Sequence, residues 1–286
     1  MTQNMLSFGH GYSARALTKL LLPNGWHITG TTRSPDKATA LQSTGVTPLI
    51  WPGSDVGQAL EQATHLLISA GPDDAGDPVL NALGDQIKAA APHLKWVGYL
   101  STTGVYGDHK GGWVDESTPL TPSTKRGHHR VIAEAQWQAL ATEAGLPLHI
   151  FRLAGIYGPG RGPFAKVRAG TARRIIKDNQ VFSRIHVDDI AQIVAASIAQ
   201  PNPGAIYNLC DDDPAPPQDV IGYAANLLGL PLPPEESYET AEMTPMARSF
   251  YAESKRVRND LIKDQLGVKL LYPDYRAGLN ALLTDQ

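Results

Sequence analysis

The chain has 286 residues, which is enough for one large α/β domain with an appended lobe or for two domains. A formal net charge of −3 and a pI near 6.3 give no reason to expect nucleic acid or an anionic membrane as a partner. The single cysteine, Cys210, excludes an intramolecular disulfide and a thiolate metal cluster. We therefore expect a small-molecule partner and no metal ion.

The sequence also lacks the marks of export or membrane insertion. No apolar run approaches the roughly 18 residues of a membrane span. The N-terminus has no basic region followed by a long apolar one. We expect a cytoplasmic protein without a membrane partner, and leave open whether it forms a homodimer.

The first informative stretch is a short apolar strand that runs into glycines and then into a helix. Gly9, Gly11 and Ala14 fall on the G-x-G-x-x-G/A spacing of a dinucleotide-binding turn. Phosphates bind at such a helix start because its free N–H groups and its dipole favour anions. Small residues also end strands for purely structural reasons, so the pattern alone is weak. The residues expected to hold a cofactor here are Gly9, Gly11, Tyr12, Ser13 and Ala14.

Strands and helices alternate along the first two thirds of the chain, which predicts a parallel sheet. The expected strands are at about Met5–Phe8, Trp26–Thr31, Pro48–Trp51, His65–Ser69, Lys95–Ser101 and Ala205–Cys210. The expected helices are Tyr12–Leu22, one beyond Pro35, Val56–Gln62, Val79–Ala91 and Gln218–Leu228.

The residues after the second strand bear on the choice of cofactor. An Asp or Glu about 20 residues past the glycines binds ribose hydroxyls, whereas an Arg there accommodates a 2′-phosphate. Arg33 takes this place, with Thr31 and Thr32 as hydroxyl donors. The guanidinium geometry favours NADP over NAD, and the nearby Asp36 keeps NAD as the alternative.

Small residues end the fourth expected strand, at Ser69, Ala70 and Gly71. A cofactor lying across the carboxyl edge of the sheet needs close backbone approach at this point. Alternatively, these small residues only form a tight loop before Pro72. The two interpretations, a cofactor contact and a tight loop, are compatible. We include the three residues in the cofactor site.

Later motifs add a family resemblance. They are Leu100-Ser101-Thr102-Thr103-Gly104-Val105-Tyr106-Gly107, Phe151-Arg152-Leu153-Ala154-Gly155-Ile156-Tyr157-Gly158-Pro159-Gly160, Arg184-Ile185-His186-Val187-Asp188-Asp189-Ile190-Ala191, Ser254-Lys255-Arg256-Val257-Arg258-Asn259 and Tyr272-Pro273-Asp274-Tyr275-Arg276-Ala277-Gly278-Leu279. In this order they resemble the extended and atypical short-chain dehydrogenase/reductases, a Rossmann family that includes NAD-dependent epimerases and dehydratases.

The resemblance implies an α/β fold, a doubly wound parallel Rossmann sheet with a smaller interleaved C-terminal substrate lobe. Residues 1–153 would form the dinucleotide-binding domain, to whose sheet a strand near 205–210 returns. Residues 154–286 would form mainly the substrate-binding lobe.

The resemblance also implies roles at the end of the fifth strand. Thr102 matches the family's Ser/Thr that hydrogen-bonds the reacting oxygen of the substrate, and Ser101 lies beside it in the cofactor site. Thr103 and Gly104 stand where the sugar dehydratases carry an Asp-Glu pair for acid/base elimination. A nucleotide-sugar 4,6-dehydratase is therefore not expected.

The helix after this strand departs from the family. Members that transfer hydride use Tyr-x-x-x-Lys, in which the Lys lowers the pKa of the phenol and binds the nicotinamide ribose. An alignment on Ala133-Glu134 puts Arg130 at the Lys position and Arg126 at the Tyr position. Arg130 can still hold ribose hydroxyls, but arginine is a poor proton shuttle.

Three explanations remain open for the missing tyrosine. Another group supplies the proton, with Tyr106, Tyr157, His128 or His129 as candidates. Alternatively, Arg126 binds and polarises a carboxylate or phosphate of the substrate. In the third explanation, the site binds NADP without turning it over.

A basic run in the second lobe bears on the substrate. Seven Lys/Arg residues lie between Arg161 and Arg184, against the single acid Asp178. An anionic substrate and a solvated helix face explain this run equally well. The residues expected to bind substrate are Tyr157, Arg161 and Arg184.

The remaining features are assigned to structure. His186 has no second ligand at metal spacing, and Asp188 and Asp189 are placed to cap the following helix. Residues 243–251 are a candidate lid.

We therefore expect an NADP-dependent oxidoreductase or epimerase-like enzyme that acts on a polar, anionic carbonyl or sugar-like substrate, with nucleotide sugars included. The expected catalytic residues are Thr102, Tyr106, Arg126 and Arg130. The alternative is a non-catalytic NADP-binding sensor, because Arg126 and Arg130 replace the Tyr and Lys.

Overall fold

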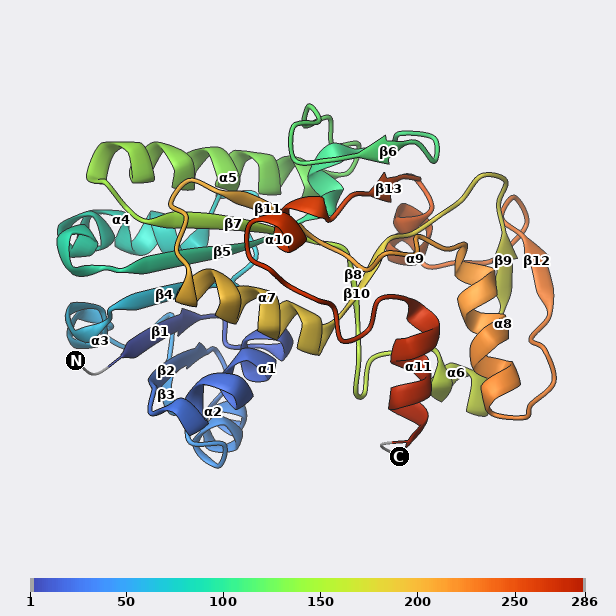
Figure 1. The fold of residues 1–286 in the computed structure, drawn as a ribbon, viewed down its shortest axis with the longest axis horizontal. Coiled ribbons are helices and arrows are strands. Elements are labelled where there is room, and N and C mark those ends of the chain that lie inside the picture. Colours follow the sequence, from blue (N-terminus) through green and yellow to red (C-terminus); the bar gives the residue numbers. More distant parts are fainter. Residues whose placement is uncertain (1–2, 285–286) are drawn as a thin grey trace.

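A seven-stranded parallel sheet forms the centre of the larger part of the molecule (Figure 1). The computed structural model describes residues 3–284. The strand order is β11-β7-β5-β4-β1-β2-β3. The strands are β1 (Asn4–Phe8), β2 (His27–Thr32), β3 (Thr47–Ile50), β4 (His65–Ile68), β5 (Trp96–Thr102), β7 (Leu148–Leu153) and β11 (Ile206–Leu209).

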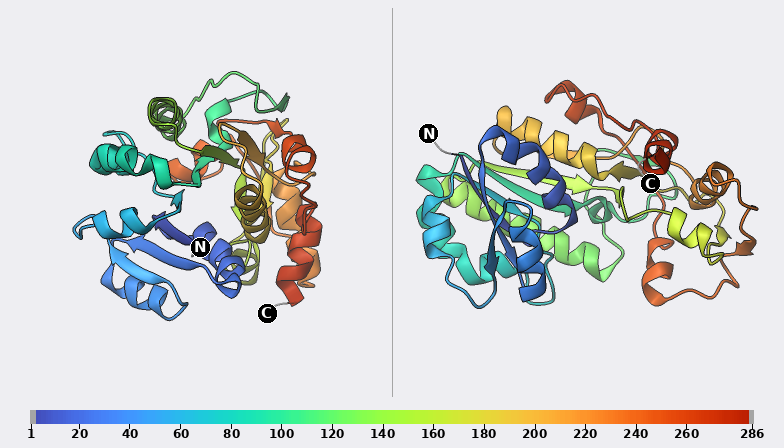
Figure 2. Two further views of the ribbon diagram at one scale, coloured as in Figure 1. Left: turned by 60° about the vertical axis from the view of Figure 1, so that its left-hand side comes forward. Right: turned by 90° about the horizontal axis from the view of Figure 1, so that it is seen from below.

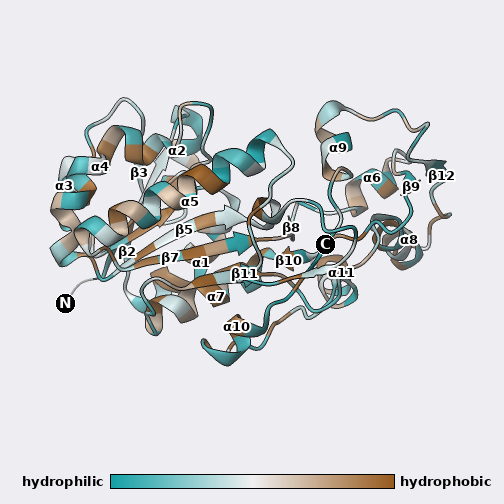
Figure 3. Ribbon diagram, turned by 90° about the horizontal axis from the view of Figure 1, so that it is seen from above, coloured by the Kyte–Doolittle hydropathy of each residue, from teal (hydrophilic) through white to brown (hydrophobic). Residues whose placement is uncertain are grey.

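Helices cover both faces of this sheet, as the end-on view in Figure 2 shows. One face carries α1 (Tyr12–Leu21), α2 (Pro35–Gln42), α7 (Val187–Ala199) and α10 (Asp260–Asp264). The other carries α3 (Gly57–Gln62), α4 (Pro78–Ala90) and α5 (Lys125–Ala144). Side chains of a strand alternate between faces, so Met5 packs in the first core and Leu6 in the second. Hydrophobic stretches accordingly lie along the central strands in Figure 3.

The strand order confirms the predicted doubly wound Rossmann sheet. The chain runs outward from β1 in both directions, through β2 and β3 on one side and through β4, β5 and β7 on the other. Such a reversal opens a crevice at the carboxyl ends of the strands, where ligands bind. The strand predicted near 205–210 is β11, which pairs in parallel with β7.

A smaller lobe lies beyond the carboxyl ends of the strands (Figure 1). Its core combines residues from widely separated segments, including Tyr157, Phe164, Ala224 and Leu279. Its helices are α6 (Phe164–Arg168), α8 (Pro217–Leu227), α9 (Pro245–Phe250) and α11 (Tyr275–Thr284). Short parallel pairs complete it: β8 (Gly155–Tyr157) with β10 (Arg184–His186), β9 (Arg174–Ile176) with β12 (Glu235–Ser237), and β6 (Trp113–Val114) with β13 (Arg256–Val257). The 3₁₀ turns are η1 (Leu22–Asn24), η2 (Ala91–His93) and η3 (Thr103–Tyr106).

The expected division into a sheet domain up to residue 153 and a lobe after it is simpler than the path that the chain follows. Both α7 and α10 follow that residue, yet their apolar side chains pack in the sheet core. The chain therefore crosses between the sheet and the lobe several times. The apolar face of the sheet is covered in part by α7 and α10, which come after the first lobe segments in the sequence.

The start of α7 corrects the predicted cap. The helix is capped by His186, whose Nδ1 accepts the N–H of Asp188 at 3.2 Å. Asp189 is fully buried in the first turn and accepts the N–H groups of Leu271 at 2.7 Å and Tyr272 at 3.1 Å. This carboxylate therefore fastens the C-terminal segment to α7 and does not cap the helix.

A buried polar network lies under the end of β5 and supports the site. Arg152 and Glu134 form an ion pair at 2.8 Å, with side chains only 3% and 2% exposed. Ser101 donates to Glu134, and Arg152 also donates to the phenol of Tyr106 at 3.0 Å. Tyr106 in turn donates to Asn208 at 2.7 Å. The network thus joins α5, β5, β7 and β11 just below the cleft.

We predict that Glu134→Gln lowers the free energy of unfolding by about 3 kcal/mol or more, because it leaves the buried guanidinium of Arg152 without a counter-charge. Urea denaturation measures this change. Glu143→Gln is the control, since Glu143 forms an exposed pair with Lys88, and its unfolding curve should nearly overlay the wild type. Equal effects of the two substitutions would contradict the prediction.

Three histidines are packed in the larger part of the molecule. The side chains of His10, His65 and His149 are buried. Burial lowers the pKa of each imidazole from 6.5 to about 4. The unfolded chain therefore binds more protons than the folded one between these values, so stability falls as the pH drops through this window.

We predict that His149→Gln makes the free energy of unfolding less dependent on pH. Each buried imidazole contributes up to about 1.4 kcal/mol per pH unit between its two pKa values. Urea unfolding at pH 7.5 and pH 5.0 measures the difference. The exposed His93, changed to Gln, is the control, and an unaltered pH dependence in His149→Gln would refute the assignment.

Candidate functional site

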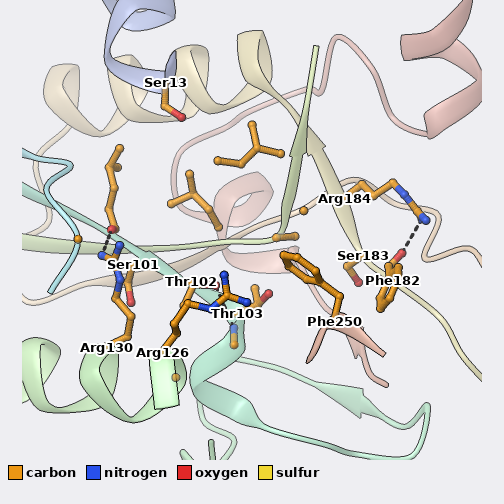
Figure 4. A pocket seen from close by; sticks show the side chains of 18 of the residues that line it. Ser13, Ser101, Thr102, Thr103, Arg126, Arg130, Phe182, Ser183, Arg184 and Phe250 are labelled. Carbon is orange, nitrogen blue, oxygen red and sulfur yellow. Dashed lines mark hydrogen bonds between the residues drawn. The ribbon is translucent and has the colours of Figure 1, made fainter. Parts of the chain in front are cut away.

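One cleft of about 810 Å³ opens at the carboxyl edge of the sheet, between the sheet and the lobe (Figure 4). It brings together residues that lie far apart in the sequence, because the parallel strands all end at this edge. The predicted site residues that line it are Gly9, Gly11, Tyr12, Ser13, Ala14, Ser69, Gly71, Ser101, Thr102, Arg126, Arg130, Tyr157, Arg161 and Arg184.

The glycine turn has no room for a side chain at its first position. Gly9 has φ +71°, and a Cβ there would lie 2.8 Å from the backbone nitrogen of Ala70. Ala70 therefore packs against the turn with its backbone and does not itself line the cleft. The N–H of Gly9 donates to the hydroxyl of Thr31 at 2.8 Å. Thr31 is thus a buried support of the turn, which corrects its predicted role as a hydroxyl donor beside Arg33.

The start of α1 faces the cleft with free backbone donors. Its N-cap is Gly11, which offers no side-chain acceptor to the first-turn N–H groups. The following residues, Tyr12, Ser13 and Ala14, line the cleft. The buried hydroxyl of Ser69 also lines it and has no hydrogen-bond partner within residues 3–284. Bare glycine backbone, free N–H groups and an unused hydroxyl fit a dinucleotide.

The predicted 2′-phosphate site lies at the outer end of β2. Arg33 is exposed there, and Thr32 accepts the N–H of Ser34 on its hydroxyl at 3.3 Å. Neither residue lines the cleft. Their part in cofactor choice stays a prediction.

Thr102 and Ser101 end β5 side by side but use their hydroxyls differently. Thr102 Oγ1 accepts the N–H of Gly104 at 3.1 Å, which leaves the hydroxyl hydrogen of Thr102 free to point into the cleft. The hydroxyl of Ser101 donates to the buried Glu134. Ser101 therefore lines the cleft, but the hydrogen of its hydroxyl is used in the buried network and is not available to a ligand.

The two arginines of α5 lie one helical turn apart in the cleft wall (Figure 4). Arg130 donates to the carbonyl of Leu100 at 2.6 Å and to the phenol of Tyr99 at 3.1 Å, which holds its guanidinium against β5. Arg126 reaches across to α9, where it donates to Ser249 at 3.1 Å and lies 5.2 Å from the ring centre of Phe250. The proposed lid is therefore joined to α5 through Arg126.

Three of the other candidates for the proton donor, Tyr106, His128 and His129, do not line the cleft. Tyr106 is fully buried in the network, does not line the cleft, and has its pKa raised to about 12 by burial. This placement corrects its expected catalytic role. His128 contacts the carbonyl of its own helix at Thr124, and His129 pairs with Asp74 at 2.9 Å on the helix surface.

Tyr157 lines the cleft from the lobe, but its hydroxyl points away from open solvent. The phenol donates to the carbonyl of Asp274 at 3.4 Å, and burial raises its pKa above the usual value. It can offer a surface to a substrate but does not release a proton near neutral pH.

The basic run separates into two groups. Arg173 pairs with Glu236 at 2.8 Å and Arg174 with Glu235 at 3.0 Å, so these charges belong to the lobe surface. The guanidinium of Arg184 donates to the carbonyls of Phe182 and Ala215, at 2.8 and 3.0 Å. Burial lowers the pKa of Arg184. Of the run, only Arg161 and Arg184 line the cleft.

The structure also brings residues into the cleft that sequence reasoning did not assign to it. Lys255 donates to the carbonyl of Gly107 at 2.8 Å and to Glu253 at 2.6 Å, and Glu253 accepts from Ser123 at 2.6 Å. The only sequence signal was the family motif around Lys255, which carries no information about where this segment folds. The other unassigned side chains in the wall include Phe182 and Ser183.

Residues 3–284 contain neither a membrane-spanning helix nor a metal-binding cluster. No helix among them combines the length and apolar character that a membrane crossing needs. The same residues hold no cluster of three or more His, Cys, Asp or Glu that could bind a metal ion.

Comparison with known proteins gives a consistent family. Residues 81–210 match the model of the "NAD dependent epimerase/dehydratase family". Protein YeeZ of Escherichia coli K12 is 30% identical over 284 residues, which cover 93% of this chain and 95% of YeeZ.

Solved structures agree on the fold. A functionally unknown conserved protein from Silicibacter pomeroyi is 64% identical, with a TM-score of 0.95 and 99% of each chain covered. The UDP-glucuronic acid 4-epimerase of Bacillus cereus, solved with UDP-glucuronic acid and NAD, is 18% identical, with a TM-score of 0.80 and coverage of 99% of this chain and 98% of the epimerase. The chain belongs to the NAD-dependent epimerase/dehydratase family.

Proposed function

We propose that this chain is an NADP-dependent oxidoreductase or epimerase-like enzyme that acts on a polar, anionic carbonyl or sugar-like substrate. One observation carries the proposal. A single cleft joins the glycine turn at Gly9 to the free hydroxyl of Thr102 and to the guanidinium of Arg126, which donates to Ser249.

The residues divide between cofactor and substrate by their place along the cleft. The turn at Gly9 and Gly11 and the start of α1 would hold the phosphates. Arg130, held near Gly71 and the end of β5, would hold the nicotinamide ribose. The bound dinucleotide would supply or accept the hydride.

The reacting oxygen of the substrate would be held by Thr102. Its Oγ1 already accepts one hydrogen bond from Gly104, so its own hydrogen is available for the substrate oxygen. Such a donor stabilises negative charge that develops on that oxygen. Arg126 adds a positive charge to the same wall.

The charges of the cleft support an anionic substrate. Among residues 3–284, the cations that line it are Arg126, Arg130, Arg161, Arg184 and Lys255, against Glu253 alone among the acids. Glu253 is paired with Lys255. Excess cations in a recessed site attract carboxylates and phosphates and bind them by charge-assisted hydrogen bonds.

A second function is favoured by one specific observation. By the alignment on Ala133-Glu134, Arg126 takes the position of the tyrosine that hydride-transferring members use, and neither Tyr106 nor the two histidines of α5 line the cleft in its place. This supports a sensor that binds NADP without turning it over. Turnover separates the two functions.

We predict that the wild type reduces NADP⁺ or oxidises NADPH with a member of a panel of alcohols, carbonyls and nucleotide sugars. Thr102→Val should lower kcat about 100-fold, since it removes one donor to the reacting oxygen. Thr102→Ser keeps the hydroxyl and should retain most of the activity. Absorbance at the nicotinamide band follows the reaction. Micromolar dinucleotide binding without turnover on the whole panel would favour the sensor.

We predict that the wild type binds NADP⁺ more tightly than NAD⁺. Arg33→Ala should weaken NADP⁺ binding about tenfold or more and leave NAD⁺ binding unchanged, because only NADP⁺ has the 2′-phosphate. Calorimetric titration measures both affinities, and Lys37→Ala is the control at an exposed neighbouring cation. Equal wild-type affinities for the two dinucleotides would remove the role of Arg33.

A further inference from the structure

Arg161 belongs to the lobe but lies at the cofactor turn. Its guanidinium carbon is 5.7 Å from the ring centre of Tyr12, the first residue of α1. Both residues line the cleft together with Gly9 and Gly11. From the sequence, Arg161 was expected to meet the substrate, whereas the structure puts it beside the expected phosphate position.

The turn that carries Arg161 is docked onto α1. Backbone bonds of 2.9 Å in both directions between Gly158 and Arg161 close the turn. The hydroxyl of Tyr12 donates to the carbonyl of Pro159 at 2.9 Å. A Cβ on Gly158 would lie 2.6 Å from that hydroxyl, so a glycine is needed for this close approach.

Arg161 has no acid partner among the residues that the structure describes. Within residues 3–284, no carboxylate lies within 4 Å of its guanidinium, in contrast to Arg173 and Arg174 of the same basic run. Asp188 faces Tyr12, but its own contact is with His186 at 3.6 Å. The N-terminus of α1 carries partial positive charge, so a second cation beside it is unfavourable until an anion lies between them.

We propose that Arg161 is a ligand of the dinucleotide pyrophosphate, supplied by the lobe and held in place by Tyr12. This inference rests on the proposed cofactor site. The backbone N–H groups of α1 and the guanidinium would then bind the same phosphates from two sides, and Arg forks match phosphate geometry. Cofactor binding would thereby fasten the lobe to the sheet.

The test compares two dinucleotide-site probes by calorimetric titration. NADP⁺ contains the pyrophosphate, and adenosine 2′-monophosphate contains the 2′-phosphate without it. Arg161→Gln should weaken NADP⁺ binding about tenfold or more and leave adenosine 2′-monophosphate binding unchanged, and Arg161→Lys should restore part of the loss. Arg168→Gln is the matched control, because Arg168 is exposed in the same basic run and also lies 5.7 Å from an aromatic ring centre, that of Phe164.

Each outcome is decisive. A wild type that binds neither NADP⁺ nor NAD⁺ overturns the proposed function itself. If the wild type binds and Arg161→Gln behaves as Arg168→Gln does, the pyrophosphate role is wrong. Equal weakening of both probes in Arg161→Gln also overturns it, since the substitution then disturbs the site as a whole.

Tyr12→Phe tests the positioning of Arg161 separately. Loss of the bond to Pro159 should weaken NADP⁺ binding less than Arg161→Gln does. In the double variant the two losses should be less than additive, because Tyr12 acts through Arg161. Full additivity would show that Tyr12 does not position Arg161.

Discussion

The close approach of Gly9 to Ala70 is the constraint on which the site depends. The backbone of Gly9 contacts the backbone of Ala70 where the chain direction across the sheet reverses, at the adjacent ends of β1 and β4. The hydroxyl of Thr31 holds the same turn from β2. Three strands thus set the position of α1, and with it the direction of the N–H groups that face the cleft.

The buried pair of Glu134 and Arg152 gives the opposite wall its rigidity. It fastens α5 to β7, and through Ser101 to the end of β5. Arg130 and Arg126 project from that fastened helix. The position of α5 is therefore fixed by buried residues that differ from those it presents to the cleft, which is why the fold alone does not determine the chemistry.

Much of this arrangement could be predicted from the sequence, and the reasons for the exceptions are physical. Periodicity and glycine spacing located the strands and the turn because local backbone chemistry determines both. Tyr106 was misplaced because its environment comes from Arg152 and Asn208, both distant in sequence. Asp189 was misread as a cap because the N–H groups that it accepts lie about 80 residues further along the chain. Lys255 was missed for the same reason.

The repeated crossing of the chain between sheet and lobe has an evolutionary consequence. Since α7, β11 and α10 alternate in sequence with lobe segments, no single cut separates a cofactor module from a substrate module. Recombination with a relative cannot exchange the lobe as one block. A change in what the cleft binds is therefore made most simply by substitution within its wall, which leaves the path of the chain unchanged.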